Sequence, residues 1–163
     1  MAAANLILGE EDERRLTAVL RKLCEDAKSR AVFLMDREGR LLAAAGETAG
    51  VDTTSLAALT AGSIAATGSL AQLLGEKEFN ALSHEGETET LHISVAGREG
   101  ILVVRFDQRS SLGLVRLRVK RAALEIARAF QEMDQRGASR GQAAFQADFS
   151  QITDADIDNL FTS

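Results

Sequence analysis

The sequence is poor in the side chains that most often carry binding and catalysis. It has no Trp and no Tyr, and its seven Phe account for all of its 4% aromatic content. Base stacking and sugar binding depend on aromatic rings, so we do not expect a protein that binds nucleic acid or sugars. The net charge of -5 also repels phosphate backbones and anionic lipids, although arginines between Arg105 and Arg128 concentrate positive charge locally.

Cysteine and histidine are equally scarce. Cys24 is the single cysteine, so no intrachain disulfide can form. His84 and His92 are the only histidines, and one cysteine cannot complete a structural zinc site, so we interpret them as ordinary loop and strand residues. No early apolar run has the flank and length of a signal peptide or a membrane span. We therefore expect a cytoplasmic protein with no metal, no cofactor and no membrane insertion.

The sequence contains no recognisable active site. A G-x-x-x-x-G-K-[ST] loop is missing, so we do not expect the chain to bind nucleotide triphosphates. Ser110 and Ser111 have no histidine in a catalytic relation and suit the start of a helix. Arg98 and Arg109 fall in predicted loops, where they could act in trans on a partner's phosphates as an arginine finger does, but solvated loop arginines are commoner.

Hydrophobic periodicity predicts one α+β domain with helices at both ends. A length of 163 residues and 45% hydrophobic content fit one folded domain with tails. The expected elements are a helix from Glu10, a hairpin of 31–36 and 40–45 turning near Gly39, a helix capped by Asp52 or Thr53 and closed by Gly75, strands beginning at Thr90 and Gly100 with a shorter one near 82–85, and a helix from Leu112 through Met133.

The second predicted helix is unusually rich in small residues and has no charge between Asp52 and Gly75. Helical spacing predicts a core face formed by Leu56, Leu59, Ser63, Ala66, Leu70, Leu73 and Leu74. Almost opposite lies a face of Thr54, Ala58, Ala61, Ala65 and Ser69, continued by Gln72. Such a face suits close docking of a flat partner, or it is buried within its own domain, and composition alone favours neither. We call its first five residues the small-residue face.

The C-terminal part divides into two further segments. Residues 137–151 are rich in Gly, Ala, Ser and Gln, which predicts a flexible linker after a domain of residues 1–136. Residues 152–163 then recover a helical pattern, with a cap at Thr153 or Asp154. Ile157, Leu160 and Phe161 would share one face of this short, acidic, amphipathic helix.

With this order of elements, the chain resembles the roadblock, or dynein light-chain, family. The segments that carry the likeness are "VFLMDREGRLLAAAGE", "DTTSLAALTAGSIAATGSLAQLLGEKEF", "SLGLVRLRVKRA" and "DIDNLF". The resemblance spans nearly the whole chain and is most specific in the second helix and the tail. It implies an α-β-β-α-β-β-β-α fold with a five-stranded antiparallel sheet, and a homodimer.

The bacterial polarity regulators of this family give the resemblance a function. They are non-catalytic homodimers that activate a small Ras-like GTPase of the MglA type in gliding bacteria, without an inserted arginine. By that likeness the GTPase would dock on Thr54, Ala58, Ala61, Ala65 and Ser69, and the tail would contact it through Ile157, Leu160 and Phe161. It also implies concentration at a cell pole and other polarity proteins as partners.

Two other functions compete with this one. A roadblock scaffold would bridge polarity proteins without accelerating hydrolysis. A small-ligand sensor would use the sheet and the second helix as a pocket, but the sequence shows few convergent polar groups for it.

Overall fold

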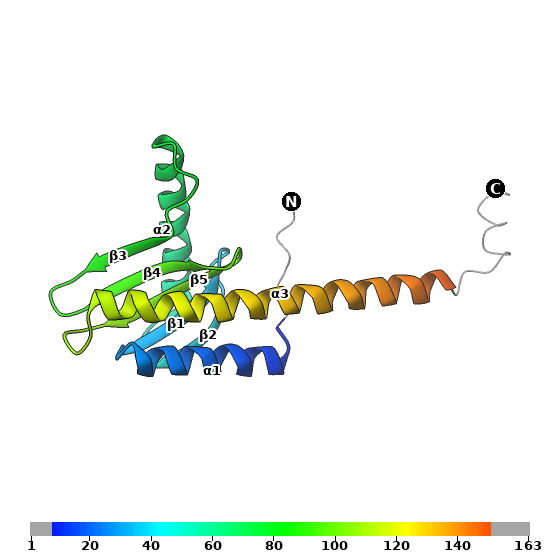
Figure 1. Ribbon diagram of the computed structural model, residues 1–163, viewed down its shortest axis with the longest axis horizontal. Coiled ribbons are helices and arrows are strands. Elements are labelled where there is room, and N and C mark those ends of the chain that lie inside the picture. Colours follow the sequence, from blue (N-terminus) through cyan, green and yellow to red (C-terminus); the bar gives the residue numbers. More distant parts are fainter. Residues whose placement is uncertain (1–7, 151–163) are drawn as a thin grey trace.

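The computed structural model describes residues 8–150, which form three helices around one antiparallel sheet (Figure 1). The strands lie in the order β2-β1-β5-β4-β3, and all neighbours pair antiparallel. The elements are α1 (Glu10–Asp26), β1 (Ala31–Asp36), β2 (Leu41–Gly46), α2 (Thr53–Leu73), β3 (Ala81–Glu85), β4 (Thr90–Ala96), β5 (Gly100–Phe106) and α3 (Leu112–Ser150). The predicted α-β-β-α-β-β-β-α order is confirmed.

Strand β1 lies inside the sheet, and all six of its residues are buried. Val32 and Leu34 belong to the hydrophobic cluster under α1 and α3, whereas Phe33 and Met35 belong to the cluster under α2. Successive side chains of a strand point to opposite faces, so this continuous apolar run needs cover on both sides of the sheet.

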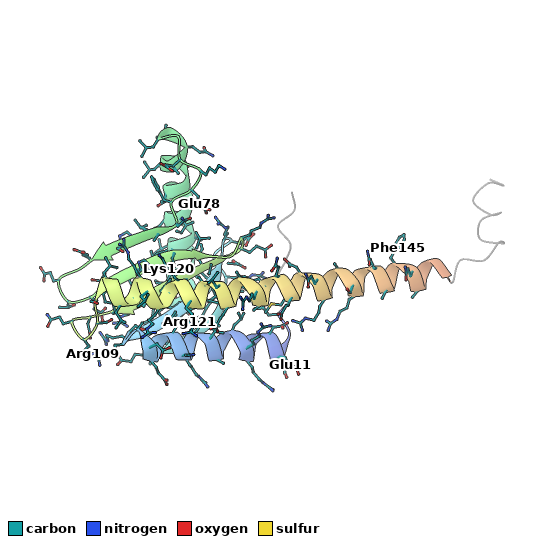
Figure 2. All side chains as sticks on the ribbon, in the orientation of Figure 1. Glu11, Glu78, Arg109, Lys120, Arg121 and Phe145 are labelled. Carbon is teal, nitrogen blue, oxygen red and sulfur yellow. The ribbon has the colours of Figure 1, made fainter. Side chains whose placement is uncertain are left out.

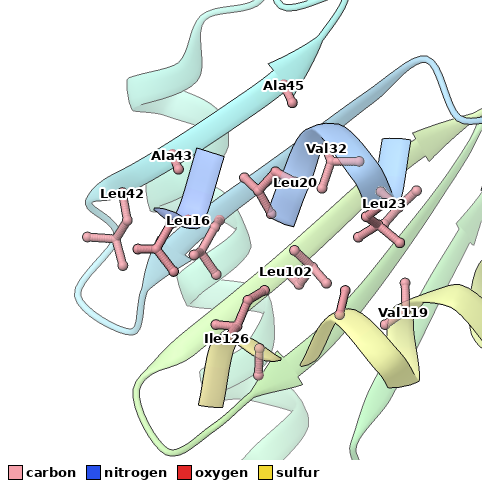
Figure 3. Close-up of a cluster of buried hydrophobic side chains, with 14 of the residues drawn as sticks. Leu16, Leu20, Leu23, Val32, Leu42, Ala43, Ala45, Leu102, Val119 and Ile126 are labelled. Atoms are coloured by element: carbon pink, nitrogen blue, oxygen red, sulfur yellow. The ribbon is translucent and has the colours of Figure 1, made fainter. Parts of the chain in front are cut away.

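Helices α1 and α3 together cover one face of the sheet (Figure 3). Leu16, Leu20 and Leu23 project from α1, and Val119 and Ile126 project from α3, into the same buried cluster. Their spacing of three, four and seven residues places each set on one side of its helix. The amphipathic patterns predicted for both helices are therefore confirmed.

Within the described part of the chain, helix α2 alone covers the other face, where it packs on β1, β4 and β5. Its N-terminus is fixed by Asp52, whose carboxylate accepts a hydrogen bond from the Ser55 amide at 3.1 Å and from the Ser55 hydroxyl at 2.6 Å. These hydrogen bonds lower the pKa of Asp52. The helix ends before Gly75, which has a φ of +76. The predicted cap and stop are both confirmed.

Helix α3 is longer than the sequence indicated, because the segment predicted as a flexible linker, 137–151, is helical through Ser150. Ala, Gln and Arg favour a helix, and the single glycines at 137 and 141 weaken it without ending it. Salt bridges Arg15–Glu132 and Asp12–Arg136 join α3 to α1. The side chains from 134 to 147 are exposed. The domain boundary predicted at 136 thus coincides with the Asp12–Arg136 ion pair to α1, and its role as a boundary stays a prediction.

We expect the two parts of α3 to differ in stability. Residues 138–147 bury no side chain in the core, whereas Val119, Ile126 and Met133 anchor the first part there. In native-state hydrogen exchange, amides of 138–147 should exchange more than about a hundredfold faster than those of 119–133. Equal protection in the two parts would show that the extension is held by contacts outside one copy of the domain.

Gly46 ends β2 in a conformation that requires glycine. Its φ is +87, and a Cβ there would lie 2.4 Å from the carbonyl oxygen of Arg30 and 2.9 Å from Sγ of Cys24. Gly50 has a similar φ of +79 but nothing within 4 Å of the Cβ position. Comparing an alanine substitution at Gly46 with one at Gly50 therefore separates the cost of backbone strain from the cost of steric overlap.

Gly46→Ala should lower the free energy of unfolding by about 2–4 kcal/mol, since strain and overlap act together. Gly50→Ala, the matched control, should cost about 1 kcal/mol from strain alone. Urea denaturation of both variants measures the difference. Equal losses would mean that the β2 end relaxes without cost.

Candidate functional site

Within the described residues 8–150, the buried residues of α2 are Ala57, Thr60, Ile64 and Ala71, and of these Ala57 and Ile64 belong to the cluster against the sheet. They form a narrow stripe, and the rest of the helix surface is exposed or half-buried. Figure 1 shows the C-terminal part of α2 extending past the sheet. The helix therefore presents two uncharged surfaces, one on each side of its contact stripe.

The predicted core face of α2 is wrong. Leu59, Leu70, Leu73 and Leu74 are 54–82% exposed, and Ala66 is exposed beside them, whereas Leu56 and Ser63 are half-buried. The largest side chains were assigned to the core, but this helix meets the sheet through small ones. A helix that is apolar on all sides has no polar face to mark which way it is turned. We call Leu59, Leu70, Leu73 and Leu74 the leucine ridge.

The small-residue face is exposed at Thr54, Ala58, Ala65 and Ser69, and Ala61 is half-buried at the edge of the α2 core. The turn between β1 and β2 meets the helix at this level, because a Cβ on Gly39 would lie 3.1 Å from the Ala58 Cα. The structure thus places the five predicted residues on one side of α2, with Ala58 beside this turn. Their role in binding is not tested by the geometry and stays a prediction.

Three hydroxyl groups in the middle and C-terminal half of α2 donate hydrogen bonds to carbonyl groups of the helix itself. Ser63 donates to the carbonyl of Leu59 at 3.0 Å, Thr67 donates to that of Ser63 at 2.8 Å, and Ser69 donates to that of Ala65 at 3.4 Å. Covering a satisfied hydroxyl costs less than covering one that must give up water. The surface of α2 is therefore chemically suited to contact another protein without polar partners.

Strand β3 adds a free sheet edge on the side of β4 opposite β5. It is hydrogen-bonded to β4 alone, and its pattern of exposed and half-buried residues shows no covering element within residues 8–150. An edge strand of this kind offers its backbone groups to another chain. Sequence analysis predicted the strand near 82–85 but not that it would be an edge.

The arginines considered for action in trans are not placed at α2. Arg109 is paired with Asp107 through two contacts of 3.1 Å, and Figure 2 shows it at the loop before α3, away from α2. The hydrogen bonds from Arg109 also lower the pKa of Asp107. Arg98 is exposed in the turn between β4 and β5, where its carbonyl accepts a hydrogen bond from Arg37.

Of the two histidines, His92 lies in a strand as the sequence predicted, and His84 does not lie in the predicted loop. His92 is buried in β4, and its Nδ1 lies 3.3 Å from the Ser83 hydroxyl. Burial lowers the pKa of His92, and nearby Arg116 lowers it further. His84 is exposed in β3 rather than in a loop. Residues 8–150 hold no group of three His, Cys, Asp or Glu side chains that could bind a metal ion.

The comparison with known families explains this arrangement. The model of the Roadblock/LC7 domain matches residues 15–106, from α1 through the end of β5. The chain belongs to the roadblock family. Among proteins of curated function, no sequence matches it.

Solved structures of roadblock proteins extend the similarity into α3. Myxococcus xanthus MglB is 46% identical, with a TM-score of 0.74, over 78% of this chain and 96% of that one. The gliding protein MglB from Thermus thermophilus is 35% identical, with a TM-score of 0.74, over 80% of this chain and 99% of that one. An MglB with a tetrameric arrangement is also 35% identical, with a TM-score of 0.75, over 81% and 99%.

Helix α2 is the one element of the described chain that is long and apolar enough to cross a membrane by length and composition. Core helices of globular proteins meet the same criterion. Here the helix lies wholly inside the matched roadblock domain and packs on its sheet. The predicted tail residues Ile157, Leu160 and Phe161 lie outside the described residues.

Proposed function

We propose that this roadblock protein is a homodimeric, non-catalytic activator of a small Ras-like GTPase of the MglA type. The observation that carries the proposal is the small-residue face of α2, which is uncharged and is exposed at all of its residues except the half-buried Ala61. Similarity to MglB structures at 35–46% identity supports it. As in the resemblance, we place the GTPase on Thr54, Ala58, Ala61, Ala65 and Ser69.

Activation of this kind needs no catalytic group from the activator. GTP hydrolysis depends mainly on positioning and electrostatic stabilisation, so a protein that holds the switch regions of a GTPase in the competent arrangement raises the rate. Arg109 is paired with Asp107 and lies away from α2, which agrees with a mechanism that inserts no arginine. The GTPase's own residues then complete its site.

The homodimer would form at the leucine ridge and the β3 edge. A two-fold axis beside β3 would pair two β3 strands antiparallel and bring the two ridges together. Leu73 and Leu74 are 82% and 71% exposed, and such a large apolar surface is typical of an interface. One GTPase would then meet helices from both copies.

The proposal also covers a contact made by the C-terminal tail and the location of the protein in the cell. We place Ile157, Leu160 and Phe161 in a second contact with the GTPase. Localisation would be cytoplasmic and concentrated at a pole, in the control of gliding motility, with further polarity proteins as partners.

The variant Ala65→Arg should reduce activation to about the intrinsic rate, because it puts a long charged side chain in the centre of the small-residue face. Single-turnover GTP hydrolysis by the GTPase from the same organism measures the effect. Gln135→Arg, an exposed position on α3, is the matched control and should activate normally. Normal activation by Ala65→Arg would move the GTPase to another surface.

A scaffold gives a different result in the same assay. The wild-type protein would then bind the GTPase and leave its hydrolysis rate unchanged.

Introducing a carboxylate on the leucine ridge should separate the dimer. Leu70→Glu together with Leu73→Glu should give a particle of one chain mass, 17.5 kDa, in sedimentation equilibrium, because two ionised groups cannot be buried unpaired at a symmetric interface. Leu124→Glu on α3, where the leucine is 65% exposed, is the control and should stay dimeric. If the double variant and the control sediment alike as dimers, the dimer forms elsewhere.

A further inference from the structure

A groove lies on the other face of the sheet from α2, between α3 and β4. It has a volume of about 550 Å³, and its lining includes His92 and Ser94 from β4 and Arg116, Leu117 and Lys120 from α3. Helix α3 packs over β4 and β5, and the groove lies beside Asn80 and Ala81 at the start of β3. The roadblock function proposed above makes no use of it.

The floor of the groove contains a polar group without a partner. Ser94 is only 6% exposed, and its Oγ is buried and forms no hydrogen bond within residues 8–150. Ile93, the preceding residue, faces α2, so the alternation of β4 directs Ser94 toward α3. An unsatisfied buried hydroxyl is unfavourable unless something else hydrogen-bonds to it. This side chain therefore points to an occupant.

The wall of the groove is positively charged. Arg116 and Lys120 are one turn apart on α3, both are exposed, and neither has an ion pair or a hydrogen bond within residues 8–150. No Asp or Glu of the described chain lines the groove. His92 adds no charge at neutral pH, because burial and Arg116 lower its pKa. In a chain of net charge -5, this uncompensated pair favours an acidic occupant.

The groove also offers apolar contact. Leu117 is 62% exposed at its rim, with Val95 and Ala123 nearby. An occupant that matches both properties is acidic and amphipathic. Residues 152–163 have that pattern, with Asp154, Asp156 and Asp158 interleaved with Ile157, Leu160 and Phe161, and no Lys or Arg follows Arg140 in the sequence.

The segment cannot reach the groove of its own chain. From Lys120 to Ser150 the chain is continuous helix, and thirty residues of helix span about 45 Å. Eleven residues from Ser150 to Phe161, the last apolar residue of the segment, span at most about 40 Å when fully extended. Figure 1 shows α3 running away from the sheet in one straight line. An acidic segment in this groove therefore comes from another copy.

We propose that the groove between α3 and β4 binds the acidic segment 152–163 of a second copy of the chain. The carboxylates meet Arg116 and Lys120, the apolar side chains cover Leu117, and a polar group of the segment satisfies Ser94. The contact needs only a second copy, so it holds or fails independently of GTPase activation.

Photo-cross-linking in the full chain tests this. A copy with p-benzoylphenylalanine in place of Phe161 is co-expressed with a differently tagged copy that keeps Phe161, and the cross-linked pair is digested for mass spectrometry. Cross-links should join position 161 of one copy to residues 113–123 or 92–95 of the other. Cross-links confined to one copy, located elsewhere on the second copy, or absent altogether would overturn the proposal.

Charge reversal gives the matched comparison. Arg116→Glu with Lys120→Glu, in both copies, should lower the cross-link yield about tenfold, because the groove then repels the carboxylates. Arg121→Glu with Arg128→Glu is the control and should leave the yield unchanged; Figure 2 shows Arg121 on the α1 side of α3 and Lys120 on the β4 side. Circular dichroism verifies that both pairs of substitutions fold. An unchanged yield in the groove variant would also overturn the proposal.

Discussion

Burial of the central strands on both faces is the constraint on which the rest of this structure depends. β1 and β5 carry apolar side chains toward both sides, so neither face of the sheet can be left to water. Two helices meet the requirement on one face, but α2 meets it alone on the other. A helix with side chains is about 10–12 Å wide and covers little more than two strands spaced about 4.8 Å apart. This difference in helical cover between the two faces determines which surfaces are left exposed for a partner to bind.

The composition of α2 follows from its position. Ala57 and Thr60 are small enough to bring the helix backbone close to the sheet, and Ile64 fills the space beside them. With the contact made by small residues, the leucines are left outside, where they have no role in the fold of one copy. Exposed leucines and a free β3 edge occur together, which is why we assign them to one interface with another chain.

Periodicity in the sequence was sufficient for the order of elements, because strands and amphipathic helices differ clearly in the spacing of apolar residues. It failed for the rotation of α2, where Leu59 and Leu70 were placed in the core of a helix that has no polar face to orient it. Composition also failed at 137–150, since Gly and Ser suggested a linker while the neighbouring Ala, Gln and Arg sustain a helix. Ser94 gave no signal at all, because a serine in a strand is recognisable as unpaired only when its surroundings are known.

The length of α3 determines what the C-terminal segment can contact. A straight helix from Leu112 to Ser150 carries that segment away from its own sheet, so each contact we propose for it is with another molecule. The GTPase and the groove of a second copy would then compete for the same side chains, Ile157, Leu160 and Phe161. Competition of this kind links the two equilibria by mass action, so that tight binding at one partner lowers apparent affinity at the other. A roadblock dimer with such a segment would release it from the groove only where the GTPase is abundant.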